Sequence, residues 1–209
     1  MYDNKTLIPA ATAVLMACAP AALAGNGVIA GFSARAKDAL VSFDYSMRLK
    51  GEVPLTGSGS VVFKGDAYRL TGKGMELVSD GVTRWTADAA AKELYIEDAA
   101  DAGQMLLASP ALLLRDLGSA FVSSEERTAS FGGKKATAVT LTPIRDDSGI
   151  QTMTVYFISG DPAGAEVTTD DGSVTVITIT KLALSQGEGP SFVYDASALG
   201  SDWEITDLR

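Results

Sequence analysis

The chain has 209 residues, of which 46% are hydrophobic, and a formal charge of −9 with no histidine. That length accommodates one large domain with a full hydrophobic core, and the apolar content excludes a disordered chain. The negative charge argues against nucleic-acid binding, which depends on neutralising phosphates, and against adhesion to anionic lipid. The missing histidine excludes His-based acid–base catalysis and His-ligated metal sites.

Residues 1–24 have the pattern of an export signal. Lys5 supplies a minimal basic start, and the apolar stretch that follows ends in the A-x-A cleavage sequence Ala22-Leu23-Ala24. Cleavage after Ala24 predicts a periplasmic protein. Its folded part, residues 25–209, is expected to form a single domain, because no Pro/Gly/Ser-rich linker divides it.

The only cysteine, Cys18, lies inside this leader, so the folded part is expected to contain no disulfide and no thiol nucleophile. Cys18 also allows a second interpretation. The sequence Leu15-Met16-Ala17-Cys18 resembles the lipobox of bacterial lipoproteins, in which the cysteine becomes the lipidated first residue. We prefer the soluble periplasmic form over the form anchored through Cys18, and an acylated Cys18 in the native protein would reverse this choice.

The first half of the folded part predicts one helix followed by strands. Apolar residues at helical spacing indicate a short amphipathic helix over residues 28–38. Alternating apolar and polar residues then predict a strand over 41–50 and a β-meander over 61–97. Gly65-Asp66 and Asp80-Gly81 mark turns within the meander.

A second helix is predicted after the meander. Ser109-Pro110 is a strong helix start, with Ser as the N-cap and Pro at the first helical position. Gly118 stands where a C′ glycine belongs. The leucines between them cover more than one face, which indicates a helix that contacts apolar groups on two sides.

Strands resume over residues 136–141 and 152–158, and the hairpin signal Asp170-Asp171-Gly172 precedes a long strand over 173–184. Within this last strand the apolar residues change from one face to the other and back, which indicates either two partly buried faces or a β-bulge. With the closing apolar segments we count about ten strands, nearly all antiparallel. The pattern predicts a mainly β protein, a curved sheet or open barrel with helices at its mouth.

Carboxylates are the main candidates for catalysis. The adjacent pairs Asp146/Asp147 and Asp170/Asp171 lie in turns, where Asp is favoured for turn geometry. Ser–Lys nucleophile pairs stay open, although no motif singles one out. We therefore predict that the protein is not an enzyme and has neither a metal site nor a cofactor.

The apolar stripes have two interpretations, an ordinary core and a cavity lined by the concave face of the sheet, and the residues alone leave both open. Aromatic and Met side chains on one face are typical of an adaptable pocket. The candidate lining residues are Phe43, Tyr45, Met47, Val61, Phe63, Tyr68, Leu70, Met75, Leu77, Trp85, Leu94, Ile96, Met153, Val155 and Phe157.

Short motifs in a fixed order along the folded part carry a family resemblance. They include Phe63-Lys64-Gly65-Asp66-Ala67-Tyr68-Arg69-Leu70, the Ser109-Pro110 helix start and the C-terminal Trp203-Glu204-Ile205-Thr206-Asp207-Leu208-Arg209. The most diagnostic block is Ser79-Asp80-Gly81-Val82-Thr83-Arg84-Trp85. This order and spacing resemble the outer-membrane lipoprotein carrier family (LolA-like).

The resemblance implies an incomplete antiparallel β-barrel in which short helices form a lid over an apolar cavity. It implies a monomeric periplasmic carrier that takes acylated lipoproteins from an inner-membrane ABC transporter to the outer membrane, where an acceptor receives them. Well-studied members have a basic residue followed by proline after the second strand, and Lys64 is the matching candidate latch. The candidate lid residues are Phe32, Met105, Leu106, Leu112, Leu113 and Leu117.

Two alternatives to the carrier remain. One keeps the fold and makes the protein a lipid-anchored outer-membrane acceptor, with Cys18 lipidated. The other is a non-enzymatic envelope sensor or structural domain, whose apolar stripes form a filled core instead of a cavity.

Overall fold

A computed structural model describes residues 27–50, 55–99, 117, 121–144 and 148–209. The predicted leader, the body of the predicted second helix and the Asp146/Asp147 turn lie outside these residues. The elements are α1 (Val28–Ala36), β1 (Leu40–Lys50), β2 (Thr56–Lys64), β3 (Ala67–Gly72), β4 (Met75–Ser79), β5 (Thr83–Asp88), β6 (Glu93–Asp98), β7 (Phe121–Ser123), β8 (Arg127–Phe131), β9 (Lys134–Pro143), β10 (Ile150–Ile158), β11 (Asp161–Thr169), β12 (Val174–Ser185), the 3-10 turn η4 (Ala196–Ala198) and β13 (Glu204–Asp207).

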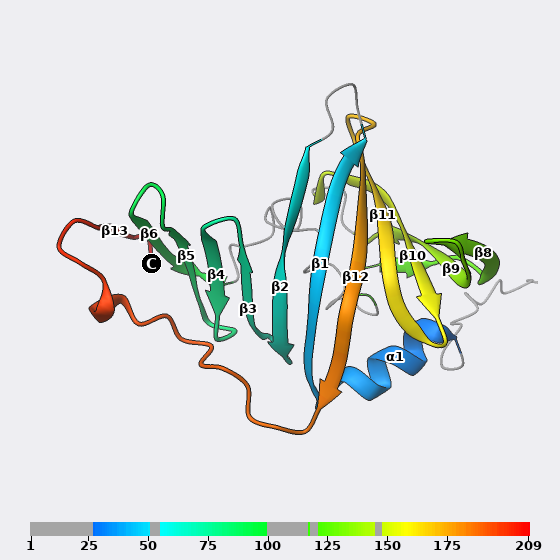
Figure 1. Cartoon of the computed structure of the whole chain (residues 1–209), viewed down its shortest axis with the longest axis horizontal. Coiled ribbons are helices and arrows are strands. Elements are labelled where there is room, and N and C mark those ends of the chain that lie inside the picture. The colour runs from blue at the N-terminus through cyan, green and yellow to red at the C-terminus, as the bar shows by residue number, and fades with distance from the viewer. Residues whose placement is uncertain (1–26, 51–54, 100–116, 118–120, 145–147) are drawn as a thin grey trace, which may run out of the picture.

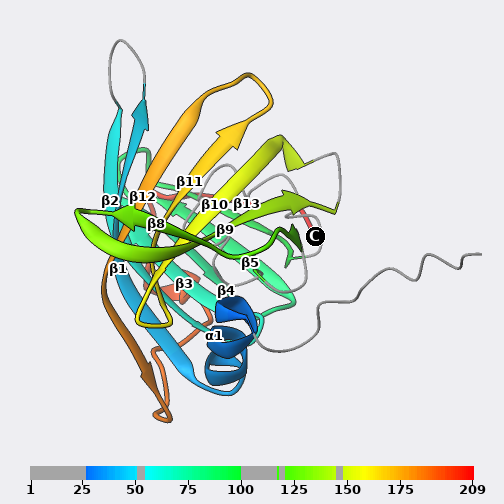
Figure 2. The ribbon, with the colours of Figure 1, turned by 90° about the vertical axis from the view of Figure 1, so that its right-hand side faces the viewer.

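All thirteen strands of the described residues belong to one sheet, in the order β13-β6-β5-β4-β3-β2-β1-β12-β11-β10-β9-β7, with β8 also paired to β9. Every pairing is antiparallel except that of β13 with β6. Figure 1 shows the sheet bending around the long central strands, and Figure 2 shows α1 lying within the curve. The sheet is therefore a half-barrel whose two ends do not pair.

The inner face of the curve carries the main core. Val41, Phe43 and Tyr45 alternate with polar residues on β1, and their neighbours Val61 and Phe63 on β2 share the same face. One cluster joins these side chains to buried residues of β3 and β4 on one side and of β9 to β12 on the other. Side chains from both arms of the sheet meet in this way only across the inside of the curve.

A β-bulge explains the phase slip predicted in the last long strand. Between β1 and β12 the register moves from Ser42↔Ala183 to Asp44↔Thr180, so β12 has one extra residue. Lys181 adopts the left-handed conformation there, with φ of 52°, and pairs with Asp44 at 2.7 Å. The bulge returns Leu182 and Leu184 to the inner face, where they pack against the main cluster together with the buried isoleucines of the same strand.

Two apolar clusters lie on the outer face near its two ends, where other segments cover them. Near β4 to β6 the C-terminal segment packs on the sheet, and Arg69 fastens it by donating to the carbonyl of Ser191 at 2.8 and 3.1 Å. At the other end Phe131 of β8 stacks on Tyr156, with ring centroids 4.7 Å apart. The predicted fold class, a mainly β and incompletely closed antiparallel barrel, is confirmed.

Candidate functional site

The apolar inner face is the candidate site. Its strands β1 to β4 and β9 to β12 contribute one continuous buried cluster, and α1 adds Phe32 and Ala36 to it. Of the predicted lining residues, ten belong to this cluster, and Met47 packs against it. The ten are Phe43, Tyr45, Val61, Phe63, Tyr68, Leu70, Leu77, Met153, Val155 and Phe157.

Three predicted lining residues lie on the opposite face, which corrects the sequence interpretation. Trp85, Leu94 and Ile96 form a second cluster with Val78, covered by the C-terminal segment. The register gives the reason: Leu77 of the inner face lies opposite Thr86, so Trp85, one residue away, points outward. Met75 is 39% exposed and is not part of the main cluster.

Glycines let large side chains lie flat on the inner face. A Cβ at Gly59 would lie 2.0 Å from the carbonyl oxygen of Thr71 and 2.9 Å from the Tyr45 ring, and one at Gly72 would lie 3.3 Å from the Tyr45 hydroxyl. Met47 similarly approaches Gly57. The close approaches to backbone oxygens make Gly59 and Gly72 obligatory here, and these glycines let Tyr45 lie down on the sheet.

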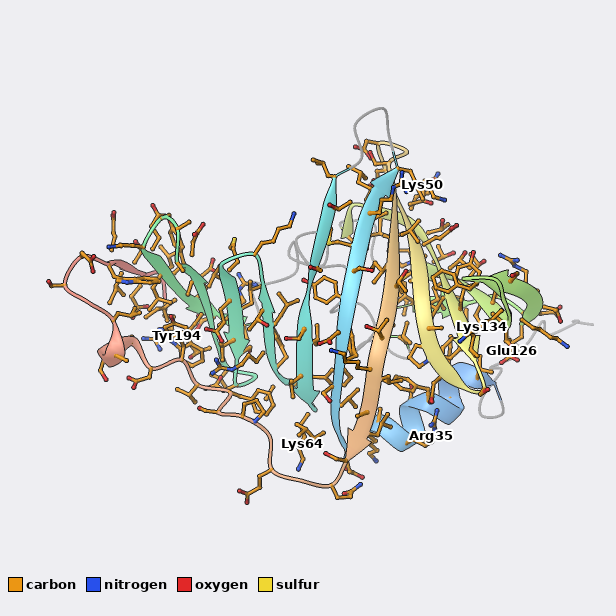
Figure 3. The ribbon with its side chains drawn as sticks, viewed as in Figure 1. Arg35, Lys50, Lys64, Glu126, Lys134 and Tyr194 are labelled. Carbon is orange, nitrogen blue, oxygen red and sulfur yellow. The ribbon has the colours of Figure 1, made fainter. Side chains whose placement is uncertain are left out.

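Helix α1 closes one end of the inner face and is tethered at both of its ends. Its first N–H, that of Val28, donates to Glu126 Oε1 at 2.6 Å, and a carboxylate is favourable at a helix N-terminus. In the last turn, Arg35 Nη2 donates to the Gly160 carbonyl and to Asp161 Oδ1, both at 2.7 Å. Figure 3 shows Arg35 and Glu126 beside this helix.

The remaining predicted lid and latch residues have different outcomes. Leu117 is 2% exposed and joins the inner-face cluster, as Phe32 does. Met105, Leu106, Leu112 and Leu113 lie outside the described residues. Lys64 is exposed at the end of β2 (Figure 3), and its side chain makes no hydrogen bond or ion pair with any residue that the structure describes.

The inner face becomes polar where it reaches β5 and β6. Arg84, with its side chain 5% exposed, donates from Nη2 to Glu97 Oε2 at 2.7 Å. Its Nε and Nη1, and the Thr86 hydroxyl, are buried and have no hydrogen-bond partner in the described part of the chain. Nearby, the hydrogen bond from the Tyr95 hydroxyl to Glu93, together with the charge of that carboxylate, raises the pKa of Tyr95.

Other features of the described residues do not suggest chemistry. They contain no cluster of three or more groups arranged to hold a metal ion. None of the described helices is long and apolar enough to cross a membrane. A groove of about 690 Å³ lies at the ends of β1, β2 and β12, with Arg48 and Lys50 among its lining residues.

This geometry defines the class of protein: a half-barrel with an apolar inner face capped by a tethered helix. No known family profile matches the chain, and no curated protein matches it either. Similar solved structures include a putative outer membrane lipoprotein-sorting protein domain from Vibrio parahaemolyticus, at 13% identity and a TM-score of 0.45 over 78% of this chain and 92% of that one.

A LolA superfamily protein from Nitrosomonas europaea is similar at 11% identity and a TM-score of 0.42, over 81% of this chain and 98% of that one. The MucA/MucB complex of Pseudomonas aeruginosa matches at 16% identity and a TM-score of 0.41, over 78% of this chain and 58% of that one. The first two names agree with the LolA-like resemblance of the sequence.

Sequence reasoning missed the tethers of α1 and the buried arginine. Arg35 and Asp161 are far apart in the chain, as are Val28 and Glu126, so no local pattern pairs them. Arg84 stands within the motif block that carries the resemblance, between Thr83 and Trp85. One sequence pattern could have indicated its position: polar Arg84 and Thr86 alternate with apolar Trp85 and Ala87, so the two pairs lie on opposite faces of the strand.

Proposed function

We propose that the protein is a periplasmic carrier that binds the acyl chains of lipoproteins on the inner face of its half-barrel. The observation that carries this proposal is one continuous apolar face, formed by both arms of an open sheet and covered at one end by the short helix α1. The absence of histidine and of cysteine after Cys18 also favours binding over catalysis.

The energetics suit a carrier. Burying one methylene contributes about 0.8 kcal/mol, so an acyl chain of roughly fifteen methylenes gains on the order of 12 kcal/mol on leaving water. The inner face is packed in this structure, with Val41, Leu141 and Met153 fully buried. Acyl binding must therefore displace apolar groups that already cover the face, and that cost keeps the net affinity low enough for release.

In this proposal α1 is the element that gives way. It contacts the inner-face cluster through buried Phe32 and Ala36 and partly buried Val28 and Ile29. Its tethers are solvent-exposed polar contacts. Such contacts are individually weak, so the helix can leave without unfolding the sheet. An inner-membrane ABC transporter of the lipoprotein-sorting type would supply the acylated lipoprotein, and an outer-membrane acceptor would take it.

The test is ligand binding by the protein purified from the cell envelope. Fluorescence of the neutral apolar dye N-phenyl-1-naphthylamine should rise saturably, and a synthetic dipalmitoyl-glyceryl-cysteinyl peptide should displace the dye. Mass spectrometry of the same preparation should find co-purified acylated lipoprotein. A protein that shows no saturable dye binding and carries no acylated species would refute the carrier.

The near-complete burial of the inner face favours one alternative, an envelope sensor or structural domain with a filled core. That alternative predicts no saturable dye binding. The other alternative, a lipid-anchored acceptor, predicts the same dye binding but an acylated Cys18 in the intact mass of the native protein.

A further inference from the structure

We propose that Arg84 and Thr86 form a polar anchor that binds the neutral carbonyl oxygens of ester- or amide-linked acyl chains. The anchor makes the inner face select such chains over free fatty acids. This inference rests on the proposed acyl-binding function and names its ligand class more closely.

The anchor adjoins the apolar inner face directly. Thr86 on β5 is the cross-strand partner of Leu77, which belongs to the main cluster. Arg84 lies opposite Ser79, which in turn lies opposite Tyr68 of the same cluster. Residues two apart on a strand share a face, so both side chains of the anchor border the surface proposed to hold the chain.

The anchor has unused donors. Glu97 takes one N–H of the Arg84 guanidinium, while Nε, Nη1 and the Thr86 hydroxyl are buried without partners in the described residues. Buried polar groups are almost always hydrogen-bonded, because an unmade bond leaves their desolvation uncompensated. An oxygen acceptor on a ligand lying along the inner face would satisfy these donors, and a hydrocarbon would not.

The charges on this part of the sheet decide between neutral and anionic acceptors. Glu97 already neutralises Arg84. The register places Asp88, Glu93 and Glu204 together, opposite one another on β5, β6 and β13, on the same face as Arg84 and Thr86. The local charge is therefore negative, and it opposes a carboxylate or phosphate while it leaves an ester or amide carbonyl unaffected.

A pair of ligands with equal chains tests the anchor: monomyristoylglycerol, with a neutral ester, and myristate, with a carboxylate. Each displaces the neutral dye, which lacks a carbonyl, from the native protein. We expect the glyceryl ester to bind at least tenfold more tightly than myristate at pH 7.5. Equal affinities would overturn the inference and leave the proposed function standing, whereas failure of the dye itself to bind would refute both.

Variants assign the selectivity to the anchor. Relative to the affinity of the same variant for the dye, Arg84→Met and Arg84→Lys should each weaken binding of the glyceryl ester about fivefold to tenfold, because methionine has no donors and lysine keeps the charge beside Glu97 but lacks the guanidinium donors. Glu97→Gln should strengthen myristate binding severalfold. Arg48→Met, which removes an exposed arginine outside the inner-face cluster, is the matched control. Unchanged ester affinity in a folded Arg84→Lys protein would contradict the anchor.

Discussion

Replacing Arg35 with alanine should tighten acyl binding, because it loosens α1 and leaves the side chains of the sheet's inner face unchanged. The substitution removes an ion pair with Asp161, whose partners are 49% and 47% exposed, and a hydrogen bond to the Gly160 carbonyl. An exposed ion pair contributes about 0.5 kcal/mol, and a hydrogen bond about 1 kcal/mol. A total of about 1.5 kcal/mol corresponds to roughly a tenfold larger population of the undocked helix.

The assay measures dye affinity and amide hydrogen exchange in parallel. We expect roughly tenfold tighter binding and a similar acceleration of exchange within Val28–Ala36, with little change in the global unfolding midpoint. Lys50→Ala is the control, since it breaks an ion pair of comparable exposure with Glu166 in a region remote from α1. If exchange in α1 accelerates while dye affinity stays within twofold of the wild type, α1 does not gate the inner face.

Three further predictions test the fold and the site. Gly59→Ala should lower the free energy of unfolding by about 3 kcal/mol, because its Cβ would clash with the Thr71 carbonyl oxygen. Gly31→Ala, with open space around its Cβ, should raise the free energy of unfolding by about 0.5–1 kcal/mol. Equal denaturation midpoints for the two variants would contradict this. Trp85→Ala and Phe157→Ala should each cost about 3–5 kcal/mol, but only Phe157→Ala should alter dye binding, so a binding change in Trp85→Ala would undo the assignment of faces. Asp207 should titrate at a pKa of about 2, held there by hydrogen bonds from the side chain and the backbone N–H of Arg209. Its stabilising effect is present above the ordinary Asp pKa and lost as pH falls through about 2. An NMR titration of Arg209→Ala should find the pKa raised towards the ordinary value, because the guanidinium is lost and the backbone N–H remains; an unchanged pKa would contradict this.

The strands and their alternation could be predicted because period-2 patterning is local. The sequence places Val41 to Leu49 and the meander correctly, and the bulge in β12 was visible as a phase slip. The face of Trp85 could not be predicted, because a segment about 110 residues further along the chain covers it. Once Trp203 and Tyr194 pack on the outer face, an apolar residue no longer has to point inward.

The sequence predicted most of the apolar residues of the candidate site, but it did not predict the contacts that hold α1 over one end of the site. Ten of the proposed lining residues share one cluster because their strands alternate cleanly. The tethers of α1 depend on pairs 98 and 126 residues apart, which a single sequence does not reveal. Lys64 was predicted as the latch from resemblance alone, yet among the described residues the contacts that hold the helix come from Arg35 and Glu126.

The polar end of the inner face fits a carrier that must release its ligand. Burial of the chain supplies nearly all of the attraction, and it does not distinguish one lipid from another. A hydrogen bond to a neutral carbonyl adds only about 1 kcal/mol net, enough to orient the ester end without preventing release. A fully charged site would bind anions more strongly, and it would hold phospholipids and fatty acids that a lipoprotein carrier has to reject. In the proposed anchor, the Glu97 partner of Arg84 therefore contributes to specificity, because it leaves donors for a carbonyl while cancelling the charge that would attract an anion.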